Sequence, residues 1–424
     1  MGGMIEVPPM EQLLGFVPTA QYGDRVDASR GCDVPGEFAC ASREPRGGAL
    51  HLSAVLGAVT DAIGQPIATA VHPDPAADRA ALGLPAARAV VVVLVDGLGY
   101  WNLAMRLAHM RYLRSLLDEP ANRRPISTTS PSTTTAAIAS FGTGTCPGLT
   151  CMTGYTQQNP ATGELAQLIA FRGAPSPEDL QREPTVFERL AERGVPVTSV
   201  GLSRFAASPF TRAALRGSRY ICADQPLDRV RKVAEAAREP GLTYLYLRDI
   251  DKTGHAEGWD SEPWVATAEK VDNQLATLRR LVPPDTLIVI VADHGMVAPD
   301  SSQRLDVASD DVLMQGVRLL AGEPRSMMVY LEDGEDVDAA ARRWRARLGE
   351  RGWVRTKAEA VEAGFFGPTC DRALATIGDL LVEAAAAVTL VDSAHQTMGA
   401  MTMPGVHGSQ TMLEMDIPCL VDLA

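Results

Sequence analysis

Unbroken apolar runs recur through the middle of the chain, and helix-length segments separate them. A run that is apolar at almost every position is typical of a strand buried on both faces of a sheet. Such runs predict core strands at 89–95, 195–201, 243–248 and 286–292. Strands that alternate with helices favour an α/β fold, in which a mainly parallel central sheet carries helices on both faces.

The segments between these runs space their apolar residues as helices do. We expect one helix over 101–117 and another over 132–141, which opens at a Ser/Thr-rich turn. A third helix is expected over 262–281, because two consecutive prolines follow it and cannot continue a helix.

The pattern is less regular at the start of the chain and again after Gly295. Residues 1–48 are rich in Gly, Pro and charge, which predicts a peripheral or poorly ordered lead-in. After Gly295 we expect only a few elements: a strand at 327–331, a solvated amphipathic helix at 336–348, and two short strands within 378–391. The resulting division is a core made of 49–295 and 396–424, with a smaller cap or insertion at 296–395.

Composition limits the classes of function. The chain has 424 residues, 46% hydrophobic, and a net charge of −13, which argues against a surface for nucleic-acid polymers. An anionic substrate would therefore need local positive charge, which bound metal ions supply. We expect no secretory signal and no membrane segment, and seven scattered cysteines indicate thiols in a reducing cytoplasm. The sequence leaves the oligomeric state open.

Acidic and histidine side chains follow two of the predicted strands. Asp96 follows the run 89–95 directly, and Asp293 and His294 end the run 286–292 just before Gly295. Ligand groups collect beyond the carboxyl ends of strands in open parallel sheets, so these side chains are candidate metal ligands. A helix N-cap remains the alternative for Asp96, and a turn histidine bonded to backbone remains the alternative for His294.

Three further motifs carry candidate chemistry. Thr134 and its neighbours lie at an expected helix start, where a hydroxyl serves either as a nucleophile or as a cap. Asp251 and His255 are four residues apart and would share one face of a helical turn, with Asp249 as the rival carboxylate. His407, in a glycine-flanked loop, is a ligand or a structural histidine. Its loop also contains Thr411 and Glu414 at the spacing of a capping box. The other histidines are expected to have no role in the site: His51, His72, His109 and His395.

The order of these motifs, with the strings D-K-T-G-H and A-D-H-G-M, resembles the alkaline phosphatase superfamily. Within it, the chain is similar to the nucleotide pyrophosphatase/phosphodiesterase-type branch over about residues 90–420. The resemblance implies an alkaline phosphatase-like fold and two zinc ions, with other divalent metals such as Mn2+ also possible. It assigns the first ion to Asp251, His255 and His407, and the second to Asp96, Asp293, His294 and Thr134.

The resemblance also implies a covalent nucleophile. In the family's motif this residue lies ten positions before the glycine of a closing Thr–Gly pair. Counting back from Gly144 gives Thr134, with Thr133 as the alternative. The chain departs from many relatives at Thr150–Cys151, where they carry His–Gly. At the nucleophile, the chain lacks the Cys/Ser-x-Pro-x-Arg string of the sulfatases, which counts against sulfate esters. It also lacks the serine that the phosphoglycerate mutases of the superfamily use there, which counts against that activity.

The sequence therefore predicts a two-metal phosphoester hydrolase of the phosphodiesterase/nucleotide pyrophosphatase type, acting on a small phosphoester through a phospho-threonine intermediate. Two alternatives remain open. One is a phosphomonoesterase or phosphonate hydrolase with the same metal core, and the other is a catalytically silent, metal-stabilised binding protein. Loops near Tyr155 and Arg204 are expected to determine specificity.

Overall fold

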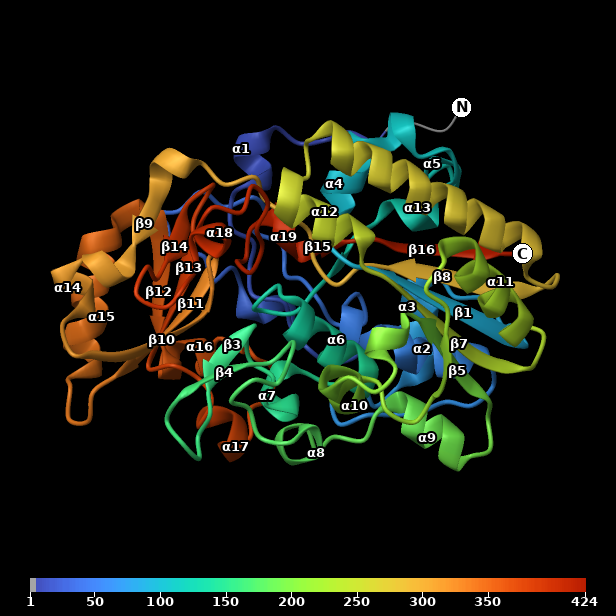
Figure 1. Ribbon diagram of the computed structural model, residues 1–424, viewed down its shortest axis with the longest axis horizontal. Helices are drawn as coiled ribbons and strands as arrows, with labels where there is room; N and C mark the ends of the chain where they lie inside the picture. The colour runs from blue at the N-terminus through green and yellow to red at the C-terminus, as the bar shows by residue number, and fades with distance from the viewer. Residues whose placement is uncertain (1–4) are drawn as a thin grey trace.

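A six-stranded sheet is the largest sheet of the computed structural model, which describes residues 5–424 (Figure 1). The strand order is β16-β8-β1-β7-β5-β6. All neighbours that the structure pairs are parallel except β16, which runs antiparallel to β8. The strands span β1 Ala89–Val95, β5 Val197–Gly201, β6 Arg219–Cys222, β7 Gly241–Leu247, β8 Thr286–Val291 and β16 Cys419–Leu423.

The four expected core strands are confirmed as β1, β5, β7 and β8. Every residue of β1 is buried, because it lies between β7 and β8 in the middle of the sheet. Val90 and Val93 illustrate the register, since each pairs with β7 on one side and with β8 on the other. The carboxyl ends of β1, β7 and β8 therefore meet at one edge of the sheet.

Helices cover both faces of this sheet, as the α/β pattern predicts (Figure 1). On one side α13 runs along the sheet together with α5 and α11, and on the other side lie α2, α6, α9 and α10. The expected helix over 262–281 is confirmed as α13. The bounds are α2 Val55–Ala62, α5 Arg111–Leu116, α6 Thr134–Thr143, α9 Val186–Glu192, α10 Pro209–Ala214, α11 Pro226–Ala236 and α13 Glu262–Leu281.

The single helix expected over 101–117 is wrong. The structure has α4 at Tyr100–Met105, a 3-10 turn at Leu107–His109, and then α5. The second helix begins anew because Asp272, on α13, accepts hydrogen bonds from the first-turn backbone N–H groups of Tyr112 and Leu113. The local sequence pattern does not show a helix start whose backbone N–H groups are satisfied by a side chain from a distant helix.

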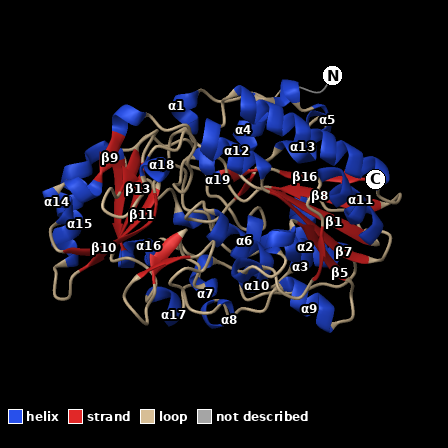
Figure 2. Cartoon of the chain, viewed as in Figure 1, coloured by secondary structure: helices blue, strands red, loops and turns tan. Residues whose placement is uncertain are grey.

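The expected cap region contains a second sheet with its own apolar core, and Figure 2 shows the strands gathered in two sheets at opposite ends of the view. This antiparallel sheet has the order β10-β11-β13-β12, and α15 packs on β12. The expected strand at 327–331, the helix at 336–348 and two strands within 378–391 are confirmed. Their bounds, with the unexpected β9, β10 and β12, are β9 Arg304–Asp306, β10 Val317–Glu323, β11 Ser326–Leu331, α15 Val337–Leu348, β12 Gly352–Thr356, β13 Leu380–Ala384 and β14 Thr389–Val391.

The lead-in has little regular structure beyond the short helix α1, Met10–Leu13. Leu13, Phe16 and Val17 are nevertheless buried, so this part of the segment packs on the rest of the protein. Its first four residues lie outside the described part of the chain. Within residues 5–424, no helix combines the length and the apolar character that a membrane span requires.

One buried ion pair joins the cap sheet to the C-terminal loop. Arg325, between β10 and β11, donates two hydrogen bonds to the carboxylate of Glu414, at 2.8 and 3.1 Å, and both side chains are fully buried. The capping box expected from Thr411 and Glu414 is wrong, because the Glu414 carboxylate pairs with Arg325. The Thr411 hydroxyl donates to Glu414 instead of accepting from the helix backbone. The loop that carries His407 is therefore anchored to the cap.

We predict that Arg325→Met lowers the free energy of unfolding by about 3–5 kcal/mol, because it leaves the Glu414 carboxylate buried without a counter-charge. Urea unfolding followed by circular dichroism measures the loss. Arg212→Met is the control, because the Arg212–Glu178 pair is half-exposed and its loss costs about 0–1 kcal/mol. Equal losses in the two variants would contradict the prediction.

Candidate active site

The carboxyl end of β1 places Asp96 at the edge of the sheet. Its backbone N–H donates to Leu247 at the end of β7, which extends the strand pairing by one residue. One carboxylate oxygen, Oδ2, accepts a hydrogen bond from the Tyr246 hydroxyl, while Oδ1 is buried without a partner. The expected alternative of an N-cap is not observed, since Gly99 precedes α4.

Gly97 makes the turn after Asp96. Its φ is +71°, and a Cβ at this position would lie 2.9 Å from the Cα of Asp251. Its backbone N–H donates to Oδ1 of Asp293 at 3.0 Å. The glycine therefore lets three segments of chain approach one another: the turn after β1, the turn after β8 and the helix that carries Asp251.

Asp293 and His294 lie just past the end of β8, where the chain has already left the strand. Adjacent strand residues point to opposite faces, so only this departure lets both side chains reach one site. Asp293 Oδ2 and Asp96 Oδ1 are each 3.5 Å from His294 Nε2. The ligand atoms of these three residues all lie within 4.8 Å of one another.

Asp251 and His255 lie on α12, Asp249–Glu257, which begins two residues beyond the end of β7. Their spacing of four residues brings His255 Nε2 within 3.2 Å of Asp251 Oδ1. His407 Nε2 is 3.9 Å from the same oxygen, and the three residues form a second group with ligand atoms within 4.8 Å. Asp249, the rival carboxylate, belongs to neither group.

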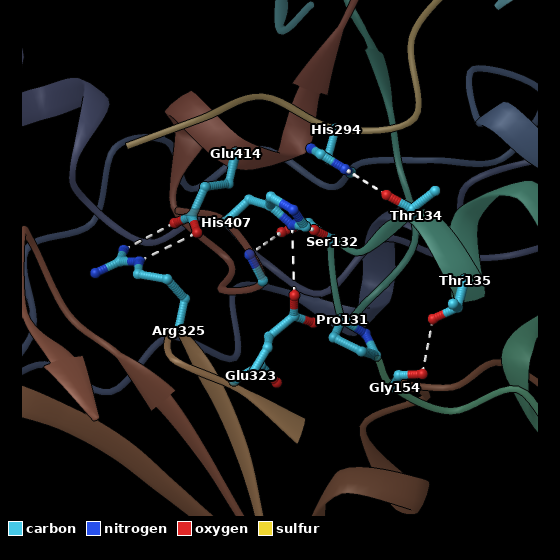
Figure 3. A network of polar contacts seen from close by, with 12 residues as sticks. Pro131, Ser132, Thr134, Thr135, Gly154, His294, Glu323, Arg325, His407 and Glu414 are labelled. Atoms are coloured by element: carbon cyan, nitrogen blue, oxygen red, sulfur yellow. Dashed lines mark hydrogen bonds and ion pairs between the residues drawn. The ribbon is translucent and has the colours of Figure 1, made fainter. Parts of the chain in front are cut away.

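The two groups adjoin one another. The rings of His294 and His407 stack with centroids 3.6 Å apart, so one histidine from each group is in direct contact with the other (Figure 3). All six Asp and His residues predicted from the sequence therefore converge. The segments that carry them are separated by up to 311 positions, from Asp96 to His407.

Thr134 is the first residue of α6, and its hydroxyl lies 3.2 Å from Nε2 of His294 (Figure 3). The Thr133 side chain does not cap the helix, so the first N–H groups of α6 have no side-chain acceptor. The Thr133 hydroxyl is buried without a hydrogen-bond partner. Of the two threonines, Thr134 is the one in contact with the Asp/His groups.

Backbone carbonyls orient the three histidine rings in the same way. Nδ1 of His255 lies 2.8 Å from the Gly405 oxygen, Nδ1 of His294 lies 3.0 Å from that of Gly295, and Nδ1 of His407 lies 2.9 Å from that of Ser132. A carbonyl only accepts, so each Nδ1 carries the proton. In the neutral rings, each Nε2 then directs its lone pair at the carboxylates, as in metal-binding histidines.

The electrostatics of the cluster favour a cation. Burial, together with the charges of Asp293 and Asp251, raises the pKa of Asp96 well above its ordinary range. Burial and the neighbouring histidines lower the pKa of His407 far below its ordinary value, so this ring is neutral at pH 7. Burial would also lower the pKa of His255, but the Asp251 carboxylate outweighs it and the pKa is raised.

The donor atoms fit a pair of divalent metal ions. Asp96 Oδ1, Asp251 Oδ1 and Asp293 Oδ2 are buried without hydrogen-bond partners, and an unpaired buried carboxylate oxygen is costly. Carboxylate oxygens and imidazole nitrogens are ligands of zinc and related metals. Each group offers two kinds of donor, and together they carry three carboxylates, which two divalent ions would more than balance.

A cavity of about 1120 Å³ opens onto this cluster from between the main sheet and the cap. Five predicted site residues line it: Asp96, Thr134, Asp251, His255 and His407. Several aromatic side chains are among its other lining residues, and Tyr155 and Arg204, the expected specificity positions, both line it. Three arginines on its walls supply positive charge in an otherwise acidic protein: Arg172, Arg204 and Arg248.

Two functional contacts escaped the sequence analysis. Tyr246 donates to Asp96, and burial with the nearby Asp96 charge raises the pKa of the Tyr246 hydroxyl, which therefore stays protonated. Glu323, at the end of β10, places a carboxylate oxygen 3.5 Å from Nδ1 of His407. Tyr246 lies within the predicted strand 243–248, next to the Asp251 motif, so its position at the site could have been inferred from the sequence. No local motif surrounds Glu323. Of the four histidines expected to have no role, the exposed His395 lines the cavity and pairs with Asp392.

This fold and this cluster are those of the alkaline phosphatase-like class of proteins. The chain belongs to the type I phosphodiesterase/nucleotide pyrophosphatase family, whose profile matches residues 90–410. The family and superfamily expected from the motifs are thereby confirmed.

Solved structures support the same fold. Murine ectonucleotide pyrophosphatase/phosphodiesterase 5, an inactive threonine-to-alanine variant in complex with AMP, has a TM-score of 0.62 and 15% identity, covering 79% of this chain and 87% of that one. Phosphonoacetate hydrolase from Sinorhizobium meliloti 1021, in complex with phosphonoformate, has a TM-score of 0.60 and 21% identity, covering 80% and 91%.

A curated relative matches over a shorter stretch. Phosphopentomutase of Rhizobium meliloti (strain 1021) is 30% identical over 119 residues, which is 27% of this chain and 28% of that protein. The aligned stretch thus spans less than a third of the relative's length.

We predict that Gly97→Ala is more destabilising than Gly83→Ala, although the two glycines have φ of +71° and +69°. Both variants incur about 1–2 kcal/mol for an L-residue in the left-handed region. At Gly97 the added Cβ also meets the backbone of Asp251, which adds about 1–3 kcal/mol, whereas nothing lies within 4 Å at Gly83. Urea unfolding of the two variants makes the comparison, and equal losses would contradict the close approach.

Proposed function

We propose that the protein is a two-metal phosphodiesterase in which Thr134 attacks phosphorus and becomes transiently phosphorylated. The observation that carries this proposal is the convergence of three unpartnered carboxylate oxygens and three imidazole Nε2 atoms beside the Thr134 hydroxyl, at the end of a large cavity. Asp251, His255 and His407 would hold one ion. Asp96, Asp293, His294 and Thr134 would hold the other.

Two such ions, of zinc or a related divalent metal, supply Lewis-acid stabilisation of the attacking and leaving oxygens and lower the pKa of a bound hydroxyl or water. The protein's own residues orient the reaction. The position of Thr134 at the start of α6 directs its oxygen into the cavity, and the free N–H groups of the first turn face the place where a phosphoryl oxygen would bind. The Ser132 and Gly405 carbonyls fix the histidine rings.

The cavity supports an ester with a large organic substituent. Its volume of about 1120 Å³ exceeds what an inorganic phosphate or a short phosphonate fills. Tyr155, Phe205 and Tyr220 give it aromatic walls, and Arg204 and Arg248 add positive charge. A diester with an aromatic group, such as a nucleotide derivative, suits this lining better than a small monoester does.

The fold shared with a phosphonoacetate hydrolase supports phosphonate or phosphomonoester hydrolysis as the second candidate activity. It would use the same metal core and the same threonine. We expect bis-p-nitrophenyl phosphate to be hydrolysed with a higher kcat/KM than either p-nitrophenyl phosphate or phosphonoacetate. Steady-state kinetics with the three compounds decide between the activities, and a preference for phosphonoacetate would replace the phosphodiesterase proposal.

We predict that Thr134→Ala lowers kcat on bis-p-nitrophenyl phosphate at least 10³-fold while the zinc content falls little, because six other ligands remain. Thr133→Ala is the matched control, since it removes a neighbouring buried hydroxyl that has no hydrogen-bond partner, whereas the Thr134 hydroxyl lies beside His294. Thr134→Ser should keep part of the activity because it retains the hydroxyl. If Thr133→Ala is the inactive variant and Thr134→Ala retains turnover, the nucleophile assignment is wrong.

Metal removal provides a separate test of the ligand assignment. We expect dialysis against a chelator to abolish turnover and zinc to restore it, because the metal ions would supply the Lewis-acid stabilisation of the attacking and leaving oxygens. Asp293→Asn should lower the zinc content measured by mass spectrometry. Full turnover in protein shown to be free of metal would refute the two-metal assignment and leave the fold assignment intact.

A further inference from the structure

A third group of metal-ligand side chains lies outside the cavity described above. It joins Asp24 in the lead-in, His72 in the turn before α3, and Asp78 on α3, Pro75–Leu82. Ligand atoms of the three residues all lie within 4.8 Å of one another. His72 Nδ1 is 3.2 Å from Asp78 Oδ2 and 3.9 Å from Asp24 Oδ1.

The donor atoms of this group are buried without hydrogen-bond partners. Asp78 is 0% exposed and His72 is 1% exposed. Both carboxylate oxygens of Asp78, Oδ1 of Asp24 and Nδ1 of His72 have no hydrogen-bond partner. Buried carboxylates are normally paired or bound to metal, because desolvation of an isolated charge is expensive. Within residues 5–424, no Lys or Arg forms an ion pair with Asp24 or Asp78 that would serve this purpose.

A chain of hydrogen bonds fixes which nitrogen of His72 carries the proton. His51 Nε2 lies 3.0 Å from the Thr128 carbonyl, so it must donate there. Burial lowers the pKa of His51 to about 3, so the ring is neutral and its Nδ1 is an acceptor. This Nδ1 accepts from the Ser53 backbone N–H at 3.1 Å, and Ser53 Oγ lies 2.8 Å from it. Two lone pairs would repel each other at that distance, so Ser53 Oγ directs its proton to His51 as well.

The same hydroxyl must then accept from His72. Its oxygen is 2.7 Å from His72 Nε2, which accordingly carries a proton and donates to Ser53. This leaves His72 Nδ1 facing the Asp78 carboxylate at 3.2 Å. A bare lone pair and a carboxylate oxygen repel each other at that distance, so a cation or a second proton must lie between them.

The charge balance favours a metal ion over a proton. With a neutral imidazole, the two carboxylates give the group a charge of −2, which a proton would only halve and a divalent ion would cancel. Two carboxylate oxygens and one imidazole nitrogen suit zinc or manganese. The Asp24 side chain is 16% exposed, so water has access to complete the coordination.

We propose that Asp24, His72 and Asp78 bind a divalent cation of the zinc or manganese class, separate from the ions at Thr134. The cation links the lead-in to α3. The other polar contact between the two segments here is one hydrogen bond, from the Asp74 N–H to Asp24 Oδ2. A chain of hydrogen bonds connects this group to the backbone of the active site. The Thr128 carbonyl accepts from His51, while the Thr128 hydroxyl donates to the backbone of Asp293.

Metal analysis in a background without the active-site ions tests this proposal. The variant Asp251→Asn/Asp293→Asn removes one ligand from each active-site group and leaves the third group intact. After loading with zinc and dialysis, we expect it to retain one equivalent of zinc by mass spectrometry. Adding Asp24→Asn or Asp78→Asn should remove that equivalent, and Asp24 is partly exposed, so its variant is the less demanding one for folding.

Asp74→Asn in the same background is the matched control. Asp74 lies four residues from Asp78 and caps α3 with its side chain, a role that asparagine also fills. We expect this control to retain its zinc, and zinc to raise the Tm of the background and the control without raising that of the Asp24→Asn variant. Zinc content and Tm that do not differ between control and Asp24→Asn would overturn the proposal in favour of a protonated His72. Failure of the active-site assignment would appear differently, as equal zinc content in the wild type and the background.

Discussion

Buried negative charge is the constraint on which the site depends. Asp96, Asp251 and Asp293 meet at one edge of the sheet, away from bulk water, and each leaves one oxygen without a hydrogen bond. The second oxygen accepts a hydrogen bond in two of them: from Tyr246 in Asp96, and from the Gly97 N–H in Asp293. The unpaired oxygens are therefore candidate ligands for cations, which would offset the cost of burying them.

The parallel sheet and the cap contribute differently to this arrangement. The sheet brings together the ends of β1, β7 and β8, and so places three of the segments that carry the Asp and His cluster. The cap acts on the fourth segment, because the buried Arg325–Glu414 pair anchors the loop that carries His407, and Glu323 lies against that histidine. One wall of the cavity and one ligand loop therefore depend on the same contact.

Much of the fold could be predicted from the local pattern of apolar and polar residues. The strands β1, β5, β7 and β8 and the helix α13 have continuous apolar runs or helical periods, and these local patterns are sufficient to predict them. The break between α4 and α5 was not readable, because Asp272 on another helix caps α5. The edge strands β6 and β16 also escaped notice, since they are short and are held by pairing with a neighbour.

The sequence by itself determined the fold class, the family and the Asp, His and Thr side chains that converge, because those residues directly follow strands or open a helix in recognisable strings. Tertiary structure decided which oxygens remain unpaired, which threonine contacts His294, and which nitrogen of each histidine faces inward. It also decided that His72, which looked ordinary in the sequence, lies between two buried carboxylates. Hydrogen bonds between distant segments fix these features, and such bonds exist only once the chain has folded.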